Sequence, residues 1–365
     1  MDKTIKMNMR TLLFALICLV LTFGMLCSTS MEAKAFDRWW GGDPIREVLV
    51  KGADLQLSRQ GTYVNACGDS YGPPNVPTIE NTWEWIIGSG ETCWNVGGAS
   101  AIGLLAAYER THNRDYLDGA IKQGNTLKKK YDTIVTDDPE GAEWVDRPFS
   151  QDIEFLVDLS RVSHYHSYAK LARDWYDIVI TNKTAVENAD RYIDARKSLA
   201  GWDLSSQIRA ALAVGQWRYS RDMAKRLLER RADWEGVLYG AYDYTILSYS
   251  GLLWALAEIR FGGREIAAAE REFRDLVLEA QVQEGPQAGS WQDGEYQTTA
   301  FAILGLDAAY GRQHDIVKAL GKAFAFLRDT QTAEGGWSYP PEYGEDNSEV
   351  LMALGGLHRR EIGLR

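Results

Sequence analysis

The sequence predicts an all-α protein in which about six helical hairpins close into a two-layered α/α toroid. Helical periodicity dominates the long segments, whereas strand patterns are sparse. Short polar loops recur about every 40 to 60 residues, an interval that fits repeated helical hairpins. The residues that mark these loops are Trp94, Trp144, Trp202, Asp243, Trp291 and Trp337.

Two kinds of helix alternate along the chain. The helix expected over 298–310 is apolar on nearly every side, which indicates that neighbours bury it all around. The next helix, over 314–329, has one apolar face and one charged face. The same pair recurs at 97–108 and 116–131. This alternation predicts an inner and an outer layer, and because no polar capping repeat is evident, we expect the layers to close into a ring.

Inner helices of such a ring run parallel, so that their N-terminal ends meet at one end of the central cavity. We expect these helices to start near residues 97, 150, 204, 244, 297 and 347. The toroid should span 91–358, with a short tail at 359–365. An extension over 36–90 precedes it and contains a Gly- and Pro-rich loop at 68–77.

The N-terminus has the pattern of a secretory signal peptide over 1–35. Three basic residues precede an almost uncharged apolar run at 11–27, and Ala33 and Ala35 then frame a cleavage site. We therefore expect an exported protein that is periplasmic, extracellular or at the cell surface. An uncleaved signal would be a membrane anchor, and this is the one membrane contact that the sequence suggests.

The composition of the chain argues against some classes of function. With 45% hydrophobic and 25% charged residues, the chain is globular, and its net charge of −11 argues against a nucleic-acid partner. Cys67 and Cys93 remain after signal removal, either as a disulfide in an oxidising compartment or as two free thiols. Their spacing does not suggest structural zinc, and we expect neither a metal nor a cofactor.

One sequence motif resembles a known family. Gln331 to Trp337 reads Q-x-x-x-G-x-W, and Gly289-Ser290-Trp291 precedes a similar helix. These segments resemble the QW repeat of squalene–hopene cyclases. The resemblance, clearest over 281–357, implies the toroid superfamily of terpenoid cyclases and protein prenyltransferases. It also implies that Trp291 and Trp337 wedge adjacent hairpins together.

The catalytic residues of those families do not carry over. The sequence has no D-x-D-D run, with which squalene-type cyclases protonate an alkene, and Asp137-Asp138 before Pro139 does not match it. Cys93 lies near the start of an inner helix, but no D-x-C motif or matching His accompanies it, so the zinc site of prenyltransferases is absent. The resemblance therefore predicts the fold and leaves the reaction open.

A polar or acidic residue stands at the start of each expected inner helix. The catalytic candidates in this ring are Asp152, Asp203, Asp243 and Asp346. The neighbouring aromatic residues, which we expect to bind ligand, are Trp94, Trp202, Tyr242, Tyr244, Tyr296 and Tyr343. Asp243 is the first choice because Tyr242 and Tyr244 flank it. The alternative is that these aspartates are ordinary helix N-caps.

Three functions fit this pattern. The first is binding of a glycan or another extended ligand or small molecule in an acidic, aromatic-lined cavity. The second is a carbohydrate-active hydrolase or lyase, because paired carboxylates can supply acid and base or acid and nucleophile. The third is a squalene-cyclase-like enzyme acting on an isoprenoid. Arg147 and Arg209 either hold an acidic sugar or form structural ion pairs.

Overall fold

A computed structural model describes residues 43–67, 75–137, 150–180, 183–259, 262–309, 314–337 and 342–357. The expected signal peptide, Trp144, Arg147, the tail at 359–365 and most of the loop at 68–77 lie outside the described residues. Contacts divide the chain into two units, Met1–Glu47 and Val48–Arg365, and the second carries the features below except for residues 44–47, the start of the first described helix. Among the described helices, none has the length and apolarity needed to cross a membrane.

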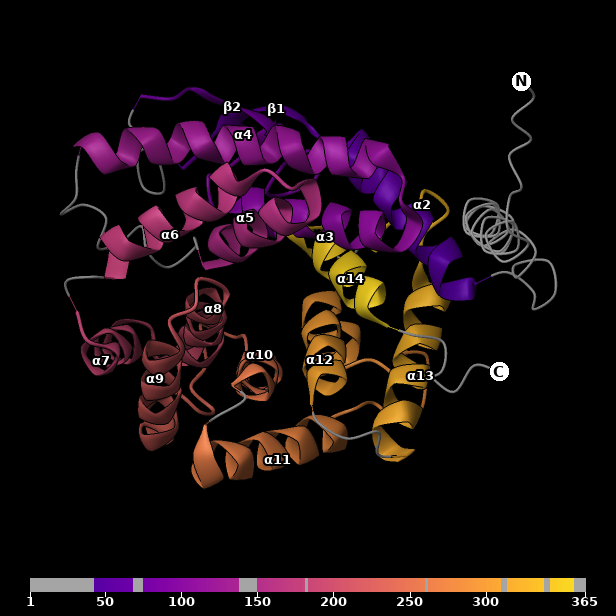
Figure 1. Ribbon diagram of the computed structural model, residues 1–365. Coiled ribbons are helices and arrows are strands. Elements are labelled where there is room, and N and C mark those ends of the chain that lie inside the picture. Colours follow the sequence, from indigo (N-terminus) through magenta and orange to yellow (C-terminus); the bar gives the residue numbers. More distant parts are fainter. Residues whose placement is uncertain are drawn as a thin grey trace, which may run out of the picture. The chain divides into compact units, whose positions relative to one another are not determined.

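Within the described part of Val48–Arg365, six helices form a closed inner ring (Figure 1). Each packs against the next in chain order, and the last packs against the first. They start close to the six expected positions, so the prediction of an all-α toroid is confirmed. The inner helices are α3 (Val96–Thr111), α5 (Ser150–Ser163), α8 (Ala200–Ala213), α10 (Thr245–Glu258), α12 (Tyr296–Ala308) and α14 (Gly344–Gly356).

The inner helices run parallel, because hydrogen bonds join starts to starts and ends to ends. At the start of α3, the Gly98 N–H donates to Oδ1 of Asp152, which lies at the start of α5. At the other end, Arg110 of α3 donates to the carbonyl of Leu357, which follows α14. We call the first end the N-terminal end of the ring and the other its C-terminal end.

Amphipathic helices cover the inner ring. For example, α4 packs on α3 and α5, α9 packs on α8, and α11 packs on α10 and α12. In α9 the buried residues Met223, Ala224 and Leu227 share one face, as the sequence pattern predicts for an outer helix. The outer helices are α2 (Pro44–Ser58), α4 (Arg114–Asp137), α6 (His166–Ile180), α7 (Ala185–Arg196), α9 (Trp217–Glu229), α11 (Gly263–Glu279) and α13 (His314–Thr330).

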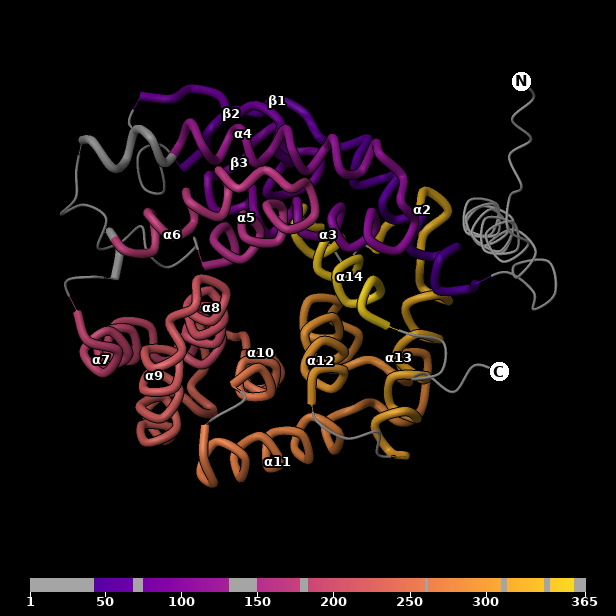
Figure 2. Tube along the Cα trace, viewed as in Figure 1, coloured from indigo at the N-terminus to yellow at the C-terminus, as the bar shows by residue number. Residues whose placement is uncertain are grey.

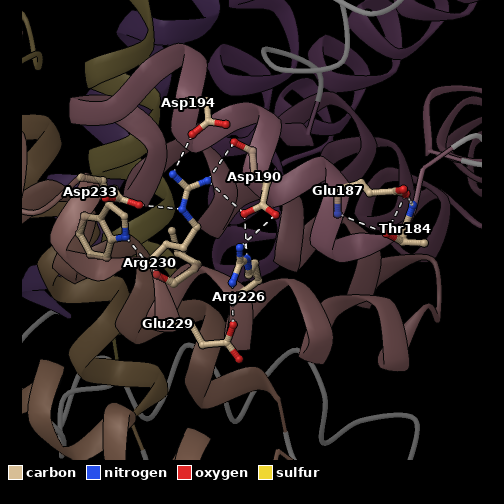
Figure 3. Close-up of polar contacts among 10 residues, drawn as sticks. Thr184, Glu187, Asp190, Asp194, Arg226, Glu229, Arg230 and Asp233 are labelled. Carbon is tan, nitrogen blue, oxygen red and sulfur yellow. Dashed lines mark hydrogen bonds and ion pairs between the residues drawn. The ribbon is translucent and has the colours of Figure 1, made fainter.

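Ion pairs fasten α7 to α9 on the outside of the ring (Figure 3). Arg226 reaches both carboxylate oxygens of Asp190, at 2.7 and 3.1 Å. Arg230 donates to Asp190, Asp194 and Asp233. Thr184 caps α7 in a reciprocal capping box with Glu187. These contacts set the position of α7, which lies next to α8 in sequence and in space.

The QW-like segments join successive outer helices. Trp291 and Trp337 are fully buried, and their indole N–H groups donate to carbonyls of α11 and α13 respectively. The Gln331 amide reaches the carbonyl of Val48 in α2, and Gln281 reaches that of Ala319 in α13. Each tryptophan thus fastens its loop to the preceding outer helix, and each glutamine ties the end of one outer helix to the next.

Part of the expected extension completes the ring. Asn347 of α14 donates to the carbonyl of Gly52 and to the side chain of Gln56, both in α2. This part of α2 therefore covers α14 as another outer helix. A small sheet follows, with strand order β2-β1-β3, and its β2 packs on α4 (Figure 2). Its strands are β1 (Gly61–Asn65), β2 (Thr78–Thr82) and β3 (Glu91–Thr92).

Two smaller features complete the described structure. Cys67, after β1, and Cys93, after β3, form a disulfide with Cα atoms 5.4 Å apart, which ties the sheet to the start of α3. Short 3-10 turns precede or follow some helices, namely η2 (Lys197–Leu199), η3 (Arg231–Asp233) and η4 (Gln292–Gly294).

Candidate functional site

The four candidate aspartates do not meet in one site. Asp152 is completely buried, and its carboxylate forms an ion pair with Lys130 of α4 at 2.9 Å while accepting from the Gly98 N–H. Burial lowers the pKa of Lys130 to about 8, and the nearby Asp152 partly offsets this effect. Asp152 therefore joins α4, α3 and α5, and it faces protein on all sides.

Asp243 and Asp203 have local partners. Asp243 is exposed and accepts from the Thr245 N–H at 2.9 Å, so it satisfies the first N–H of α10 from the position before the N-cap Tyr244. Gln292 also holds the backbone carbonyl of Asp243. Asp203 lies 3.8 Å from Arg196 and is mostly buried. Asp203 lies inside the first turn of α8, and Asp243 precedes the N-cap of α10. Neither is therefore the ordinary N-cap of the alternative prediction, although both have local structural partners.

Asp346 lies in a dense cluster of carboxylates at the start of α14. Glu345 precedes it, and Glu349 follows Glu345 by one helical turn. Glu295, which caps α12, faces the same cluster, because its charge acts on both Asp346 and Glu349. The structure therefore brings side chains from α14 and α12 together at the N-terminal end of the ring.

Amide groups hold the deepest member of this cluster. Glu349 is almost fully buried. Gln297 of α12 donates to its Oε2 at 2.9 Å, and Gln151 of α5 donates to its Oε1 at 3.4 Å. These contacts satisfy both oxygens without a positive charge, which fits either protonation state.

Burial and mutual repulsion make these carboxyl groups hard to ionise. Desolvation raises the pKa of Glu345 to about 7. It also raises the pKa of Asp346 and of Glu349 well above the usual range, and repulsion between neighbouring carboxylates adds to the effect. Acids that keep a proton near neutral pH can donate it to a ligand or substrate.

Aromatic rings surround the acidic cluster. Tyr242 and Tyr239 are 65% and 54% exposed, and each has its ring centroid 6.3 Å from that of the half-buried Tyr244. Tyr343, just before α14, lies 6.5 Å from Trp85. The tyrosines and the acids adjoin one another, because Asp346 and Tyr242 both act electrostatically on Tyr343.

We call this group the rim site. Its acidic members are Glu295, Glu345, Asp346 and Glu349, and its aromatic members are Tyr239, Tyr242, Tyr244 and Tyr343. Exposed rings of this kind offer flat apolar faces with polar edges, and the carboxyl groups beside them bind hydroxyl or amino groups. Within the described residues, no three His, Cys, Asp or Glu side chains gather as a metal site would require.

The remaining predicted aromatic residues belong to the packing of the ring. Trp94 is buried beneath Lys130, whose ammonium lies 5.7 Å from its ring. Tyr296 is buried and stacks on Phe326 at 5.7 Å. Trp202 is half-buried and meets the edge of Phe301 at 6.1 Å.

Glu345 and Glu349 were not among the predicted site residues. Their signal was the spacing of two acids, one helical turn apart, in a helix that is otherwise largely apolar. A buried helix tolerates such a pair when it serves a site, because a desolvated carboxylate is costly.

Comparison with known proteins identifies solved structures that share this fold. No family model and no curated protein matches this sequence. The chain is similar to the type II terpene cyclase MstE from Scytonema, at 14% identity and a TM-score of 0.52, over 86% of this chain and 96% of that one. It is also similar to UGL with dGlcA-Glc-Rha-Glc, at 15% identity and a TM-score of 0.52, over 88% and 97% of the two chains. A further similar structure is unsaturated glucuronyl hydrolase from Streptococcus agalactiae, at 12% identity, a TM-score of 0.48, and 86% and 90% coverage.

At these identities, the first two likenesses show a shared α/α-toroid fold and do not extend to activity. The choice between ligands therefore depends on the residues of the rim site.

Proposed function

We propose that this protein is an exported glycan-binding protein and that the glycan binds at the rim site. The observation that carries the proposal is the junction of exposed tyrosine rings with buried carboxyl groups at one end of the ring. Tyr242 and Tyr239 would stack on sugar rings, and Asp346 would bind sugar hydroxyls. The predicted signal peptide supports a ligand met outside the cytoplasm.

The charges of the rim site favour neutral or amino-bearing sugars over acidic ones. Glu295, Glu345 and Asp346 already repel one another, so an added uronic carboxylate would face the same repulsion. An isoprenoid fits less well, because its hydrocarbon chain would leave several buried carboxyl groups without partners. A neutral glycan provides both ring faces and hydroxyl groups.

Cleavage of the glycan is a second candidate function, which the raised pKa values favour. Glu345, with a pKa of about 7, holds its proton for much of the time at neutral pH and could donate it to a glycosidic oxygen. A neighbouring ionised carboxylate would then accept the proton of the attacking water. The water oxygen would bond to the anomeric carbon as the sugar–oxygen bond breaks, so that the leaving sugar takes the proton of Glu345 and the water gives its proton to the neighbouring carboxylate.

A panel of neutral, amino-bearing and acidic oligosaccharides tests the proposal, scored for both binding and cleavage. We expect a neutral or amino-bearing glycan to bind the wild type. Tyr242→Ala should weaken binding, whereas Tyr165→Ala, at a similarly exposed tyrosine of another face, should not. Asp346→Asn should weaken binding at least tenfold, and the exposed control Asp174→Asn should leave it unchanged.

Two results would overturn the proposal. One is the absence of binding across the whole panel, and the other is equal binding by wild type, Tyr242→Ala and Asp346→Asn. Release of shorter sugars by the wild type, lost in Glu345→Gln, would establish the hydrolase. Binding without release would establish a binding protein.

A further inference from the structure

A cavity of about 1270 Å³ opens at the C-terminal end of the ring, opposite the rim site. Side chains from the second halves of inner helices line it, for example Asp158 of α5, Arg209 of α8 and Trp254 of α10. The apolar lining includes Leu105 and Met352, which provide room for a hydrocarbon chain. None of the rim-site residues belongs to this lining.

A buried ion pair forms part of the cavity wall. Nε and Nη2 of Arg209 donate to Oε2 of Glu154 at 3.0 and 2.6 Å. The guanidinium also lies 3.2 Å from the ring centroid of Trp254. Arg209 is 2% and Glu154 9% exposed, so the protein shields both groups from bulk water.

One atom of each partner is left without a hydrogen bond. Among the described residues, Nη1 of Arg209 and Oε1 of Glu154 are buried and unpaired. A buried polar atom without a partner is costly, and such atoms mark places where a ligand or water completes the bonding. The ion pair therefore leaves one donor and one acceptor of the cavity wall unused.

The described lining is strongly acidic. It contains Arg209 as its one basic side chain and five carboxylates, namely Glu109, Glu154, Asp158, Glu258 and Glu270. Arg161 pairs with Glu109 at 2.6 Å and with Asp158 at 3.3 Å, so these two acids are partly neutralised. The cavity nevertheless keeps an excess of negative charge.

Glu258 is an exposed acid of the cavity lining, in a position that disfavours its negative charge. It is the last residue of α10, where the helix dipole repels an anion. The hydrogen bond described for it comes from the neutral Trp254 indole at 2.8 Å. Desolvation raises the pKa of Glu258, Arg209 partly offsets this effect, and Asp158 adds repulsion. Desolvation also raises the pKa of Glu154 to about 7, Arg209 again partly offsets it, and Glu258 adds repulsion. A further positive charge beside Glu154 and Glu258 would relieve this repulsion.

We propose that the C-terminal cavity binds an organic ammonium cation that also carries a hydroxyl or carbonyl oxygen. The ammonium group would bind Oε1 of Glu154 and the carboxylate of Glu258. The oxygen of the ligand would accept from Nη1 of Arg209, and its methylene chain would lie on the apolar lining. This ligand matches the unpaired acceptor, the unpaired donor and the excess negative charge.

The ammonium cation can come from a free amino alcohol or from a lysine side chain of a peptide. Both sources present an amine on a short hydrocarbon chain near an oxygen. A five-carbon probe, 5-amino-1-pentanol, represents the free source, and the peptide Gly-Lys-Gly represents the other. Binding of either probe supports an ammonium ligand, and the probe that binds shows whether the ligand is a free amino alcohol or a lysine side chain.

The test compares matched probes by isothermal titration calorimetry on the full chain. We expect 5-amino-1-pentanol or Gly-Lys-Gly to bind. Pentane-1,5-diol, which lacks the charge, should bind at least tenfold more weakly, and the anion 5-hydroxypentanoate should not bind. Glu258→Gln keeps an acceptor for the Trp254 indole, and it should weaken binding of the cation about tenfold.

Glu334→Gln is the matched control, because Glu334 is an exposed acid in the loop before α14 and outside the cavity. It should leave the affinity unchanged. A thermal unfolding scan checks that each variant is folded, and Asp158→Asn replaces Glu258→Gln if the latter unfolds. The proposal is overturned if neither amine binds, if the diol or anion binds as tightly, or if Glu258→Gln and Glu334→Gln bind alike.

Discussion

The two ends of the inner ring both carry carboxylates, but the surroundings of these groups differ. At the rim site, Asp346 and Glu345 crowd one another and have no cationic partner among the described contacts. At the C-terminal cavity, Glu154 pairs with Arg209, which also stacks on an indole. A carboxyl group that has no cationic partner and lies next to exposed rings can bind a ligand directly. A carboxylate in an ion pair already has part of its charge neutralised by its partner.

Asp152 sharpens this comparison, because it lies at the same end of the ring as Asp346. Both stand in the first turn of an inner helix. Asp152 meets Lys130, and Asp346 meets other acids. The position of an acid at a helix start therefore does not define its role, which depends on the partner that another helix supplies.

The largest effect on stability should come from Asp152→Asn. This change leaves the ammonium of Lys130 buried without its charged partner, and breaking a buried ion pair costs about 3–5 kcal/mol. Urea unfolding at pH 7 measures the loss. Asp243→Asn is the control, because Asp243 is exposed and the asparagine oxygen still accepts from the Thr245 N–H, so its change should stay within about 0.5 kcal/mol. Equal losses in both variants would contradict the different roles of these two aspartates.

In contrast to Asp152→Asn, Glu345→Gln should raise the free energy of unfolding. The pKa of Glu345 is raised from 4.5 to about 7 in the folded protein. The folded state therefore binds more protons than the unfolded state between these values, and the free energy of unfolding falls as pH rises through this window. Removing the charge should stabilise the protein by about 1–3 kcal/mol at pH 8 and by little at pH 4.

Urea unfolding from pH 4 to pH 8 tests this prediction, with Glu334→Gln as the control at an exposed acid. The Glu345→Gln variant should lose part of the slope that the wild type and the control share. An unchanged slope in Glu345→Gln would show that Glu345 ionises freely in the folded protein.

Arg209→Met should destabilise the protein less than Asp152→Asn does. It leaves Glu154 buried and unpaired, but this acid can keep a proton, because its pKa is already about 7 and should rise further. We expect a loss of about 1–3 kcal/mol at pH 7 and a smaller loss at pH 5. Glycan binding at the rim site should persist in the folded variant. Loss of glycan binding in this variant would show that the rim site and the C-terminal cavity are coupled.

The smallest effect should come from Tyr242→Ala. Tyr242 is 65% exposed, so unfolding free energy should change by less than about 0.5 kcal/mol. Glycan affinity should fall by about 3- to 10-fold, equivalent to one stacking contact of about 1 kcal/mol. A fluorescence or calorimetric titration measures the affinity. A large loss of stability together with affinity would instead assign Tyr242 to the packing of the rim.

Much of the fold could be predicted from the sequence, because its signals are local. The alternation of all-apolar and one-faced helices indicates inner and outer layers, and loop residues mark the starts of α12 and α14 closely. The role of α2 was not predicted. A Gly- and Pro-rich loop separates α2 from α3. Asn347, which α2 contacts, lies almost at the other end of the chain.

The candidate site could be predicted only in part. Tyr242, Tyr244, Tyr343 and Asp346 are recognisable as polar and aromatic residues near helix starts, and the structure brings them together. The role of Asp152 depends on Lys130, which comes from a neighbouring outer helix, and no local pattern reveals such a partner. Burial of Glu349 likewise depends on the closed ring.

Hydrogen–deuterium exchange, with and without the best-bound glycan, tests most directly whether the rim site holds the ligand. We expect slower exchange on binding in the backbone around 239–246 and 342–349, and no change around 154–158 and 254–258. Protection at the second pair of segments, with none at the first, would place the glycan in the C-terminal cavity and refute binding at the rim site.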